Sequence, residues 1–193
     1  MPTHATAEPR SQLAAVIFRF LQSSDAPRSF LAGWPDAIAA TTHLPKSLPV
    51  LRHLPHAMGV TLPATEALAA LLVASVGALA WHHGPTEAEL GRKFVENYGW
   101  TEIFHADRLA CGFLVLGPRT EYPTHRQAAE EICIPLAGTA FWQRGNRPFA
   151  PRPPGMIIHH PSWLPHAMRT SNDPLLALYV WRGDLLENRQ VLG

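Results

Sequence analysis

The second half of the chain is broken into short apolar segments separated by turn residues, and this pattern constrains the fold most. From Trp100 onward, runs rich in β-branched, aromatic and leucine residues alternate with Gly, Pro and Asn-Asp turn signals. The predicted strands are Ile103–His105, Leu109–Leu116, Tyr122–Arg126, Ile132–Leu136, Ala140–Arg144, Met156–His159, His166–Arg169 and Leu175–Trp181. Many short antiparallel strands at this spacing predict a small β-barrel or jelly roll.

The first half has a helical character. Apolar residues recur close to a 3.6-residue period in Ser11–Ser23, and Pro63 opens a long apolar helix that Gly84-Pro85 closes. Further helices are predicted at Arg28–Ala40, interrupted near Pro35, and at Glu87–Asn97, whereas the proline-punctuated His43–Val60 predicts short turns. Since no flexible linker separates the halves, we expect residues 1–193 to form a single domain. Residues 1–99 would be its helical part, packed on a barrel of residues 100–193.

Composition excludes several classes of protein. Hydrophobic residues make up 47% of the chain, charged residues 16%, and the net charge is +1, so the chain is globular. Arginines are scattered without a basic run, which argues against a nucleic-acid partner. The apolar run Ala67–Trp81 is too short to span a bilayer, and Leu13–Phe18 is too short for a signal peptide. With only two cysteines and no disulfide framework, we expect a cytoplasmic protein that does not bind membranes.

One segment carries the residues of a metal site. His125 and Gln127 are two positions apart, so on a strand they share a face, and Glu131 and Cys133 share the inward face of the next strand. Further along, Trp163-Leu164-Pro165 returns the imidazole of His166 to the barrel. Imidazole with carboxylate is a ligand mixture that suits Zn, Fe, Mn, Ni or Co. We therefore expect one divalent metal ion, of unknown identity.

The spacing of this segment resembles the cupin superfamily. His125-x-Gln127-x3-Glu131-x6-Gly138 fits the first cupin motif, with glutamine where a second histidine is expected, and Pro154-Gly155 with His166 and Asn172 fits the second motif loosely. The resemblance covers roughly residues 110–181. It implies a mainly β fold, a cupin (jelly-roll-like) β-barrel, behind the α-helical N-terminal half.

A narrower resemblance extends over most of the chain. Thr120-Glu121-Tyr122-Pro123-x-His125, the preceding Asn97-Tyr98-Gly99-Trp100 and the Ala/Leu-rich helix are similar to the cupin-type dimethylsulfoniopropionate (DMSP) lyases, DddQ branch. The resemblance implies metal ligands at His125, Glu131 and His166, with Gln127 at the fourth corner, and a site tyrosine at Tyr122. Two positions depart from the family, because Gln127 stands for a ligand histidine and Cys133 for a tyrosine.

The chemistry that the resemblance implies is a β-elimination, catalysed by a carbon–sulfur lyase that releases dimethyl sulfide and acrylate from DMSP. Tyr122 or Cys133 would accept the α-proton of this small carboxylate substrate. Trp142, Trp163 and Tyr179 would line a pocket for the sulfonium cation. His160 is expected as a polar residue of the pocket wall rather than as a ligand.

Other functions fit the same scaffold. A cupin oxygenase or isomerase could act on another small acid, and a non-enzymatic cupin could bind a small molecule, since one fold hosts many functions. Cupins commonly dimerise, so the resemblance also allows a homodimer.

Overall fold

The helices lie mainly in the N-terminal half of the computed structural model, which describes residues 7–185 and 191–193. Helix α1 (Ala7–Gln22) begins earlier than predicted and buries the stripe Leu13, Ile17 and Leu21 completely. Helix α3 (Pro63–Ser75) starts with Pro63 in its first turn, as predicted. Short 3-10 turns and one short helix connect these two: η2 (Arg28–Phe30), η3 (Pro49–His53) and α2 (Leu54–Ala57).

Two helical predictions are wrong in extent. The long apolar helix does not reach Gly84, because it ends at Ser75 and is followed only by the 3-10 turn η4 (Val76–Ala78). Trp81 and His82 form strand β1 instead, since Trp81 N–H bonds to Lys46 O and β1 pairs with the next strand. Arg28–Ala40 keeps only η2, and Gly33 in the left-handed region (φ 81°) is incompatible with a helix there.

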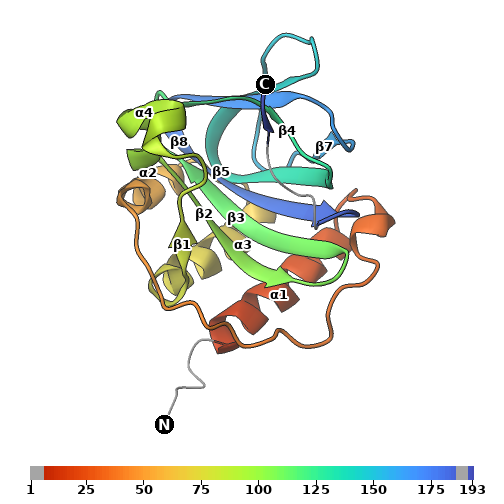
Figure 1. The fold of residues 1–193 in the computed structure, drawn as a ribbon. Helices are drawn as coiled ribbons and strands as arrows, with labels where there is room; N and C mark the ends of the chain where they lie inside the picture. Colours follow the sequence, from red (N-terminus) through yellow and green to blue (C-terminus); the bar gives the residue numbers. More distant parts are fainter. Residues whose placement is uncertain (1–6, 186–190) are drawn as a thin grey trace.

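The strands form one curved sheet in the order β1-β2-β3-β8-β4-β9, and β5 pairs with β6, β7 and β8 (Figure 1). Their bounds are Tyr98–His105 (β2), Leu109–Leu116 (β3), Glu121–Arg126 (β4), Glu130–Arg144 (β5), Ala150–Arg152 (β6), Ile158–His160 (β7), His166–Arg182 (β8) and Val191–Leu192 (β9). The prediction for β3 is confirmed to the residue. Strands β1, β6 and β9 were not predicted, and β2 begins before its predicted start.

Two long strands replace four predicted short ones. Ile132–Leu136 and Ala140–Arg144 join in β5, and His166–Arg169 and Leu175–Trp181 join in β8. The turn residue between the first pair, Gly138, takes a positive φ of 83° at an irregularity in the β5–β8 register instead of ending the strand. Because β5 and β8 pair from Glu130 to Arg144, tertiary pairing outweighs the local turn signal.

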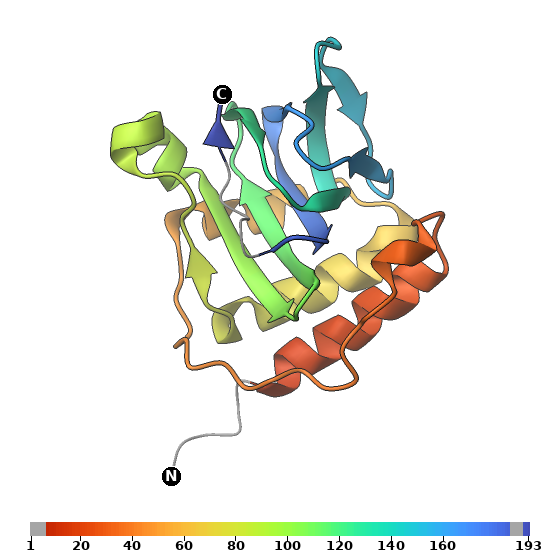
Figure 2. The same cartoon turned by 45° about the vertical axis from the view of Figure 1, so that its right-hand side comes forward.

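The sheet separates two apolar regions. Alternate residues of β3 point to opposite sides: Cys111, Phe113 and Val115 belong to the cluster that includes α1 and α3, whereas Leu114 and Leu116 face the barrel interior. Figure 2 shows α1 and α3 lying side by side against one side of the sheet. Helix α4 (Glu87–Glu96), broken at Gly91 and capped by Thr86 and Glu89, borders the other side. The helices thus cover one face of the sheet and leave the barrel interior for a site.

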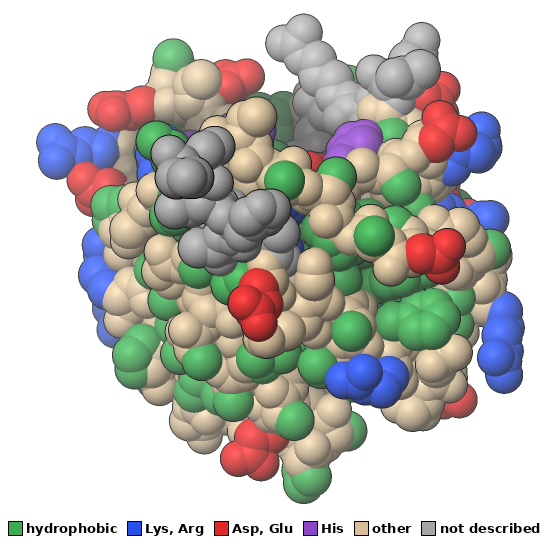
Figure 3. All heavy atoms as spheres, turned by 90° about the horizontal axis from the view of Figure 1, so that it is seen from below, with side chains coloured by type: hydrophobic (Ala, Val, Ile, Leu, Met, Phe, Trp, Pro, Cys, Tyr) green, Lys and Arg blue, Asp and Glu red, His purple; other side chains and the backbone are tan. Residues whose placement is uncertain are grey.

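The surface agrees with the even charge of the sequence. On the face seen from below in Figure 3, acidic and basic side chains are scattered among apolar and uncharged ones. Within residues 7–185 and 191–193, no helix has the length and apolar character needed to cross a bilayer. Cys111 and Cys133 are both free thiols buried in the protein.

Candidate metal centre

The barrel interior encloses a cavity of about 530 Å³. Strands β2, β3, β4, β5, β7 and β8 contribute to its wall, together with the segment before α4. Its wall includes His83, Glu89, Tyr98, Trp100, Glu102, Leu114, Tyr122, His125, Glu131, Cys133, Trp142, His160, His166, Met168, Tyr179 and Trp181. The wall is therefore mostly aromatic and aliphatic, with imidazoles and a carboxylate gathered at one place, which is typical of a small-molecule site.

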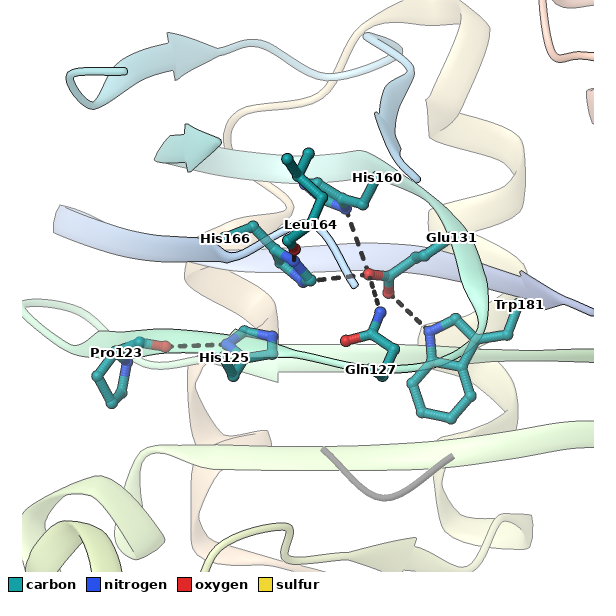
Figure 4. Close-up of polar contacts among 8 residues, drawn as sticks. All are labelled: Pro123, His125, Gln127, Glu131, His160, Leu164, His166 and Trp181. Atoms are coloured by element: carbon teal, nitrogen blue, oxygen red, sulfur yellow. Dashed lines mark hydrogen bonds and ion pairs between the residues drawn. The ribbon is translucent and has the colours of Figure 1, made fainter. Parts of the chain in front are cut away.

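Glu131 lies at the centre of the polar contacts (Figure 4). Its Oε1 accepts a hydrogen bond from Trp181 Nε1 at 2.9 Å, and its Oε2 accepts one from Gln127 Nε2 at 3.0 Å. The same Oε2 lies 3.3 Å from a ring nitrogen of His160 and 3.3 Å from a ring nitrogen of His166. Burial alone would raise the pKa of Glu131, but the two histidines outweigh it and hold the pKa well below its usual range. The carboxylate is therefore charged and oriented toward the imidazoles.

Backbone carbonyls orient two of the imidazoles. Nδ1–H of His125 donates to Pro123 O at 2.9 Å, and Nδ1–H of His166 donates to Leu164 O at 2.9 Å. Because a carbonyl can only accept, Nδ1 carries a proton in both rings, and Nε2 is the nitrogen that can offer a lone pair to a metal. The two residues are direct partners in the β4–β8 register, and their ring centroids lie 4.2 Å apart. This is how metal-binding histidines are commonly held.

His160 reaches the same place from β7. It is the direct cross-strand partner of Glu131, it is 1% exposed, and its ring stacks on that of His166 with centroids 3.9 Å apart. Burial lowers the pKa of His160 to about 4 although the nearby Glu131 acts to raise it, and burial together with His166 lowers the pKa of His125 to about 3. Both are neutral imidazoles near pH 7, the form that binds metals.

Three residues meet the geometric requirement for a metal ion among the described parts of the chain. Glu131, His160 and His166 each offer a ligand atom, and these atoms all lie within 4.8 Å of one another. His125 is outside this group although it contacts His166. Two of the four predicted ligands, Glu131 and His166, belong to this group, and His125 lies next to it. The fourth, Gln127, points its amide nitrogen at Glu131. The structure adds His160, which was predicted only for the pocket wall.

The two predicted bases both line the cavity. The Tyr122 ring stacks on His125 with centroids 4.1 Å apart and contacts the Tyr98 ring at 4.9 Å. Burial and the nearby Glu131 raise the pKa of Tyr122, and the same causes raise the pKa of Cys133 well above its usual range. Neither group ionises readily without additional positive charge nearby.

The predicted aromatic wall is only partly in place. Trp142 and Tyr179 are buried and line the cavity. The prediction for Trp163 is wrong, since this residue is 47% exposed and does not contribute to the wall. The reason is a local one: Trp163 takes a positive φ of 61°, and its N–H bonds to Gln127 O. The cavity is lined instead by Tyr98, Trp100 and Trp181. Residue type alone did not show which of the aromatic residues in the sequence would line it.

Comparison with known proteins places the chain in a family. The family model for dimethylsulfoniopropionate lyases matches residues 31–177. The DMSP lyase DddQ of Ruegeria pomeroyi is 28% identical over 184 residues, 92% of either chain. The putative DMSP lyase DddL of Cereibacter sphaeroides is 29% identical over 148 residues, which are 72% of this chain and 61% of that protein, so the chain spans about three fifths of DddL.

Solved structures agree with the sequence matches. A chain from the crystal structures of the DMSP lyases RdDddP and RnDddQII has a TM-score of 0.87 at 29% identity and covers 98% of this chain and 100% of its own length. DddQ from Ruegeria pomeroyi DSS-3 has a TM-score of 0.80 at 30% identity, with 96% of each chain covered. A cupin-2 domain of Rhodospirillum rubrum, 15% identical with a TM-score of 0.50 over 60% of this chain and 75% of its own, shares the fold alone. The chain has the cupin fold and belongs to the dimethylsulfoniopropionate lyase family.

Proposed function

We propose that this protein is a metal-dependent lyase that cleaves DMSP into dimethyl sulfide and acrylate. The observation that carries the proposal is the group of Glu131, His160 and His166 in the wall of a cavity that six tyrosines and tryptophans also line, in a chain of this family. A β-elimination needs a place for the carboxylate, a base for the α-proton and an apolar place for the sulfonium group. The cavity offers residues for all three.

The donor atoms fit a divalent cation. A charged carboxylate and neutral imidazoles are ligands for Zn²⁺ and similar ions, and both ring nitrogens of the buried His160 lack a hydrogen-bond partner among the described residues. Glu131 and His166 would hold the ion, with His125 beside them. When bound, the cation supplies positive charge that stabilises the substrate carboxylate, the charge that develops at the α-carbon, and the phenolate of a nearby tyrosine.

Tyr122 is the base that we propose. It lines the cavity in contact with His125, and its phenol interacts with Tyr98, which favours the ionised form. Cys133 is the second candidate, but its pKa is lowered only by the backbone of Ile134 against the effects of burial and Glu131. As the C–H bond at the α-carbon breaks, its proton passes to Tyr122. The electron pair forms the double bond of acrylate, and the C–S electrons leave with dimethyl sulfide.

Aromatic rings would hold the sulfonium group. Trp142 and Tyr179 lie in the cavity wall, and the face of an aromatic ring attracts a cation by about 0.5–2 kcal/mol, more strongly where water is excluded. Such a pocket favours a small cationic carboxylate over a neutral one.

The experiment separates a lyase from an oxygenase or a binding protein. Metal-loaded protein is given DMSP under air and under nitrogen, with dimethyl sulfide measured by headspace gas chromatography and acrylate by NMR. We expect equimolar products at equal rates in both gases, and none with Glu131→Gln. Absence of both products from fully loaded protein overturns the proposal, and oxygen consumption with DMSP indicates oxygenase chemistry instead.

We also infer that the helical part and the barrel are one domain in a reducing compartment such as the cytoplasm. Leu13 and Leu72 from the helices share one buried cluster with Phe113 and Ile134 from the strands. A boundary near residue 99 would expose this cluster. The two free, buried cysteines are consistent with a reducing compartment.

A further inference from the structure

We propose that His160 is a metal ligand of this protein and that it supplies the imidazole which Gln127 cannot. Gln127 then acts as a positioning residue that aims the carboxylate of Glu131. This inference rests on the proposed metal site, but it does not require that the substrate be DMSP.

Strand pairing places His160 beside the other donors. β7 and β5 pair so that His160 lies directly opposite Glu131. The side chain lines the cavity, its Nδ1 lies 3.3 Å from Glu131 Oε2, and its ring is within 11° of parallel to that of His166. Figure 4 shows the two imidazoles and the carboxylate converging from three strands. A single ion can therefore contact all three residues with small side-chain adjustments.

The hydrogen bonding of His160 is incomplete. Its contact with Glu131 is close but is not aligned as a hydrogen bond, so neither ring nitrogen has a partner among the described residues. Buried polar atoms are satisfied in the great majority of cases, and each exception calls for an explanation. His125 and His166 differ, because each donates one ring proton to a carbonyl. A cation at the junction would give one of the two ring nitrogens of His160 a partner, through its lone pair.

Gln127 is in a different position. Its amide nitrogen donates to Glu131 Oε2, and the reverse orientation would set an amide oxygen against a carboxylate. An amide nitrogen carries no lone pair for a metal. Gln127 does not line the cavity. Its Oε1 is a weaker ligand than an imidazole, and it is buried with no hydrogen-bond partner within residues 7–185 and 191–193. Trp181 donates a hydrogen bond to Oε1 of Glu131 and Gln127 donates one to Oε2, so the two residues together orient both oxygens of the carboxylate.

The direct test observes His160 in the unaltered protein. Protein labelled with ¹⁵N in its histidines is titrated with Zn²⁺, and ring nitrogens are followed in long-range ¹H–¹⁵N spectra. We expect one ring nitrogen of His160 and one of His166 to move to the metal-bound range when equilibrium dialysis shows equimolar Zn²⁺. If Zn²⁺ binds and the His160 nitrogens do not move, the inference is overturned, whatever the stability of any variant.

Variants give a second, independent readout. Loss of a residue that only supports a ligand typically weakens metal binding roughly 10–100-fold. We expect Gln127→Leu to weaken Zn²⁺ binding within that range, and His160→Gln to weaken it by more than about 100-fold. The neighbouring His159→Gln is the matched control, because His159 is partly exposed and pairs with Glu130. A larger loss for Gln127→Leu than for His160→Gln would overturn the assignment.

Exchange of the two positions sharpens the test. Adding Gln127→His to His160→Gln returns an imidazole near Glu131, and we expect Zn²⁺ affinity to recover. No recovery in a folded double variant counts against an exchangeable ligand position.

Because Zn²⁺ binding is measured without DMSP, the proposal of His160 as a ligand and the proposal of lyase activity can fail separately. A His160 shift without dimethyl sulfide release refutes only the lyase activity, and release without a His160 shift refutes only the ligand.

Discussion

The side-chain amide of Gln127 donates a 3.0 Å hydrogen bond to the same oxygen of Glu131 that lies 3.3 Å from His160 and from His166. This relationship suggests a supporting role for a residue that stands where the cupin resemblance implies a ligand histidine. The amide holds the carboxylate in place while two imidazoles approach it. The metal centre that we propose therefore depends on a support that differs from the pattern of the family it resembles.

Removal of that support should weaken metal binding without unfolding the protein. Gln127→Leu keeps the side-chain size and removes an Oε1 that has no partner among the described residues, but it also removes the hydrogen bond to the buried carboxylate of Glu131. We therefore expect the thermal midpoint of the metal-free protein to fall only modestly. Zn²⁺ affinity measured by competition with a chelator should fall by about 10–100-fold. Arg126→Gln is the control, because Arg126 is the exposed last residue of β4, directly before Gln127. An unchanged affinity would show that Gln127 does not position Glu131.

Two adjacent glutamates should behave in opposite ways. Glu131→Gln should abolish tight Zn²⁺ binding, whereas Glu130→Gln should leave it intact, because Glu130 pairs with His159 and Arg182 away from the cavity. Partial burial would raise the pKa of Glu130, but these two partners outweigh it and lower the pKa. Its stabilisation, about 1 kcal/mol for such a pair, is therefore present near pH 7.

The same pKa shift sets the pH at which Glu130→Gln should matter. Because the folded-state pKa is lowered, the stabilisation is complete above the ordinary carboxyl value of 4.5 and is lost as the pH falls through the lower folded value. Urea unfolding at a series of pH values checks this. A stability difference between the two proteins that grows in acid would contradict the pairing.

Substitutions of Tyr122 and of Cys133 should have different effects on kcat. Tyr122→Phe removes the proposed base and should lower kcat by about 100-fold or more, while Zn²⁺ affinity and the thermal midpoint change little, since the ring contacts remain. Cys133→Ala should change kcat much less. If Cys133→Ala causes the larger loss and Tyr122→Phe is nearly neutral, the thiol is the base and our assignment is wrong.

Gly138 should be intolerant of any side chain. It has φ 83°, and a Cβ there would lie 1.7 Å from Pro174 O. Gly138→Ala should therefore cost about 3 kcal/mol or more of unfolding free energy, from the left-handed backbone and the overlap together. Gly145→Ala is the control, because its φ is also positive but the nearest atom is 3.8 Å from the new Cβ. We expect a cost of about 1–2 kcal/mol there, measured by denaturant unfolding. Equal costs at the two positions would contradict the close approach.

Local patterns predicted the parts of the fold that local forces determine. Strand β3 follows a continuous apolar run and is confirmed at both ends, and α1 follows its 3.6-residue stripe. The sequence predicted two short strands in place of each of β5 and β8, because Gly138 and Asp173-Pro174 carry turn signals. Those residues remain within strands because the partner strand pairs on both sides of them, which no short window of sequence reveals.

The site shows the same division. Glu131 and His166 follow from motif spacing, and the structure brings them together. The role of His160 depends on the β5–β7 register, since a shift by one residue would place His159 opposite Glu131 instead. Trp163 was misplaced because its positive φ is a loop property without a clear sequence signal.

Metal reconstitution of the lyase reaction tests the central claim most directly. Metal-free protein is titrated with Zn²⁺, Fe²⁺, Mn²⁺, Ni²⁺ or Co²⁺, and dimethyl sulfide released from DMSP is measured while bound metal is determined by elemental analysis. We predict no release without metal and, for at least one ion, release that rises linearly until each chain holds a single ion. Release that is independent of bound metal, or no release from chains shown to be fully loaded with every ion, would contradict the account.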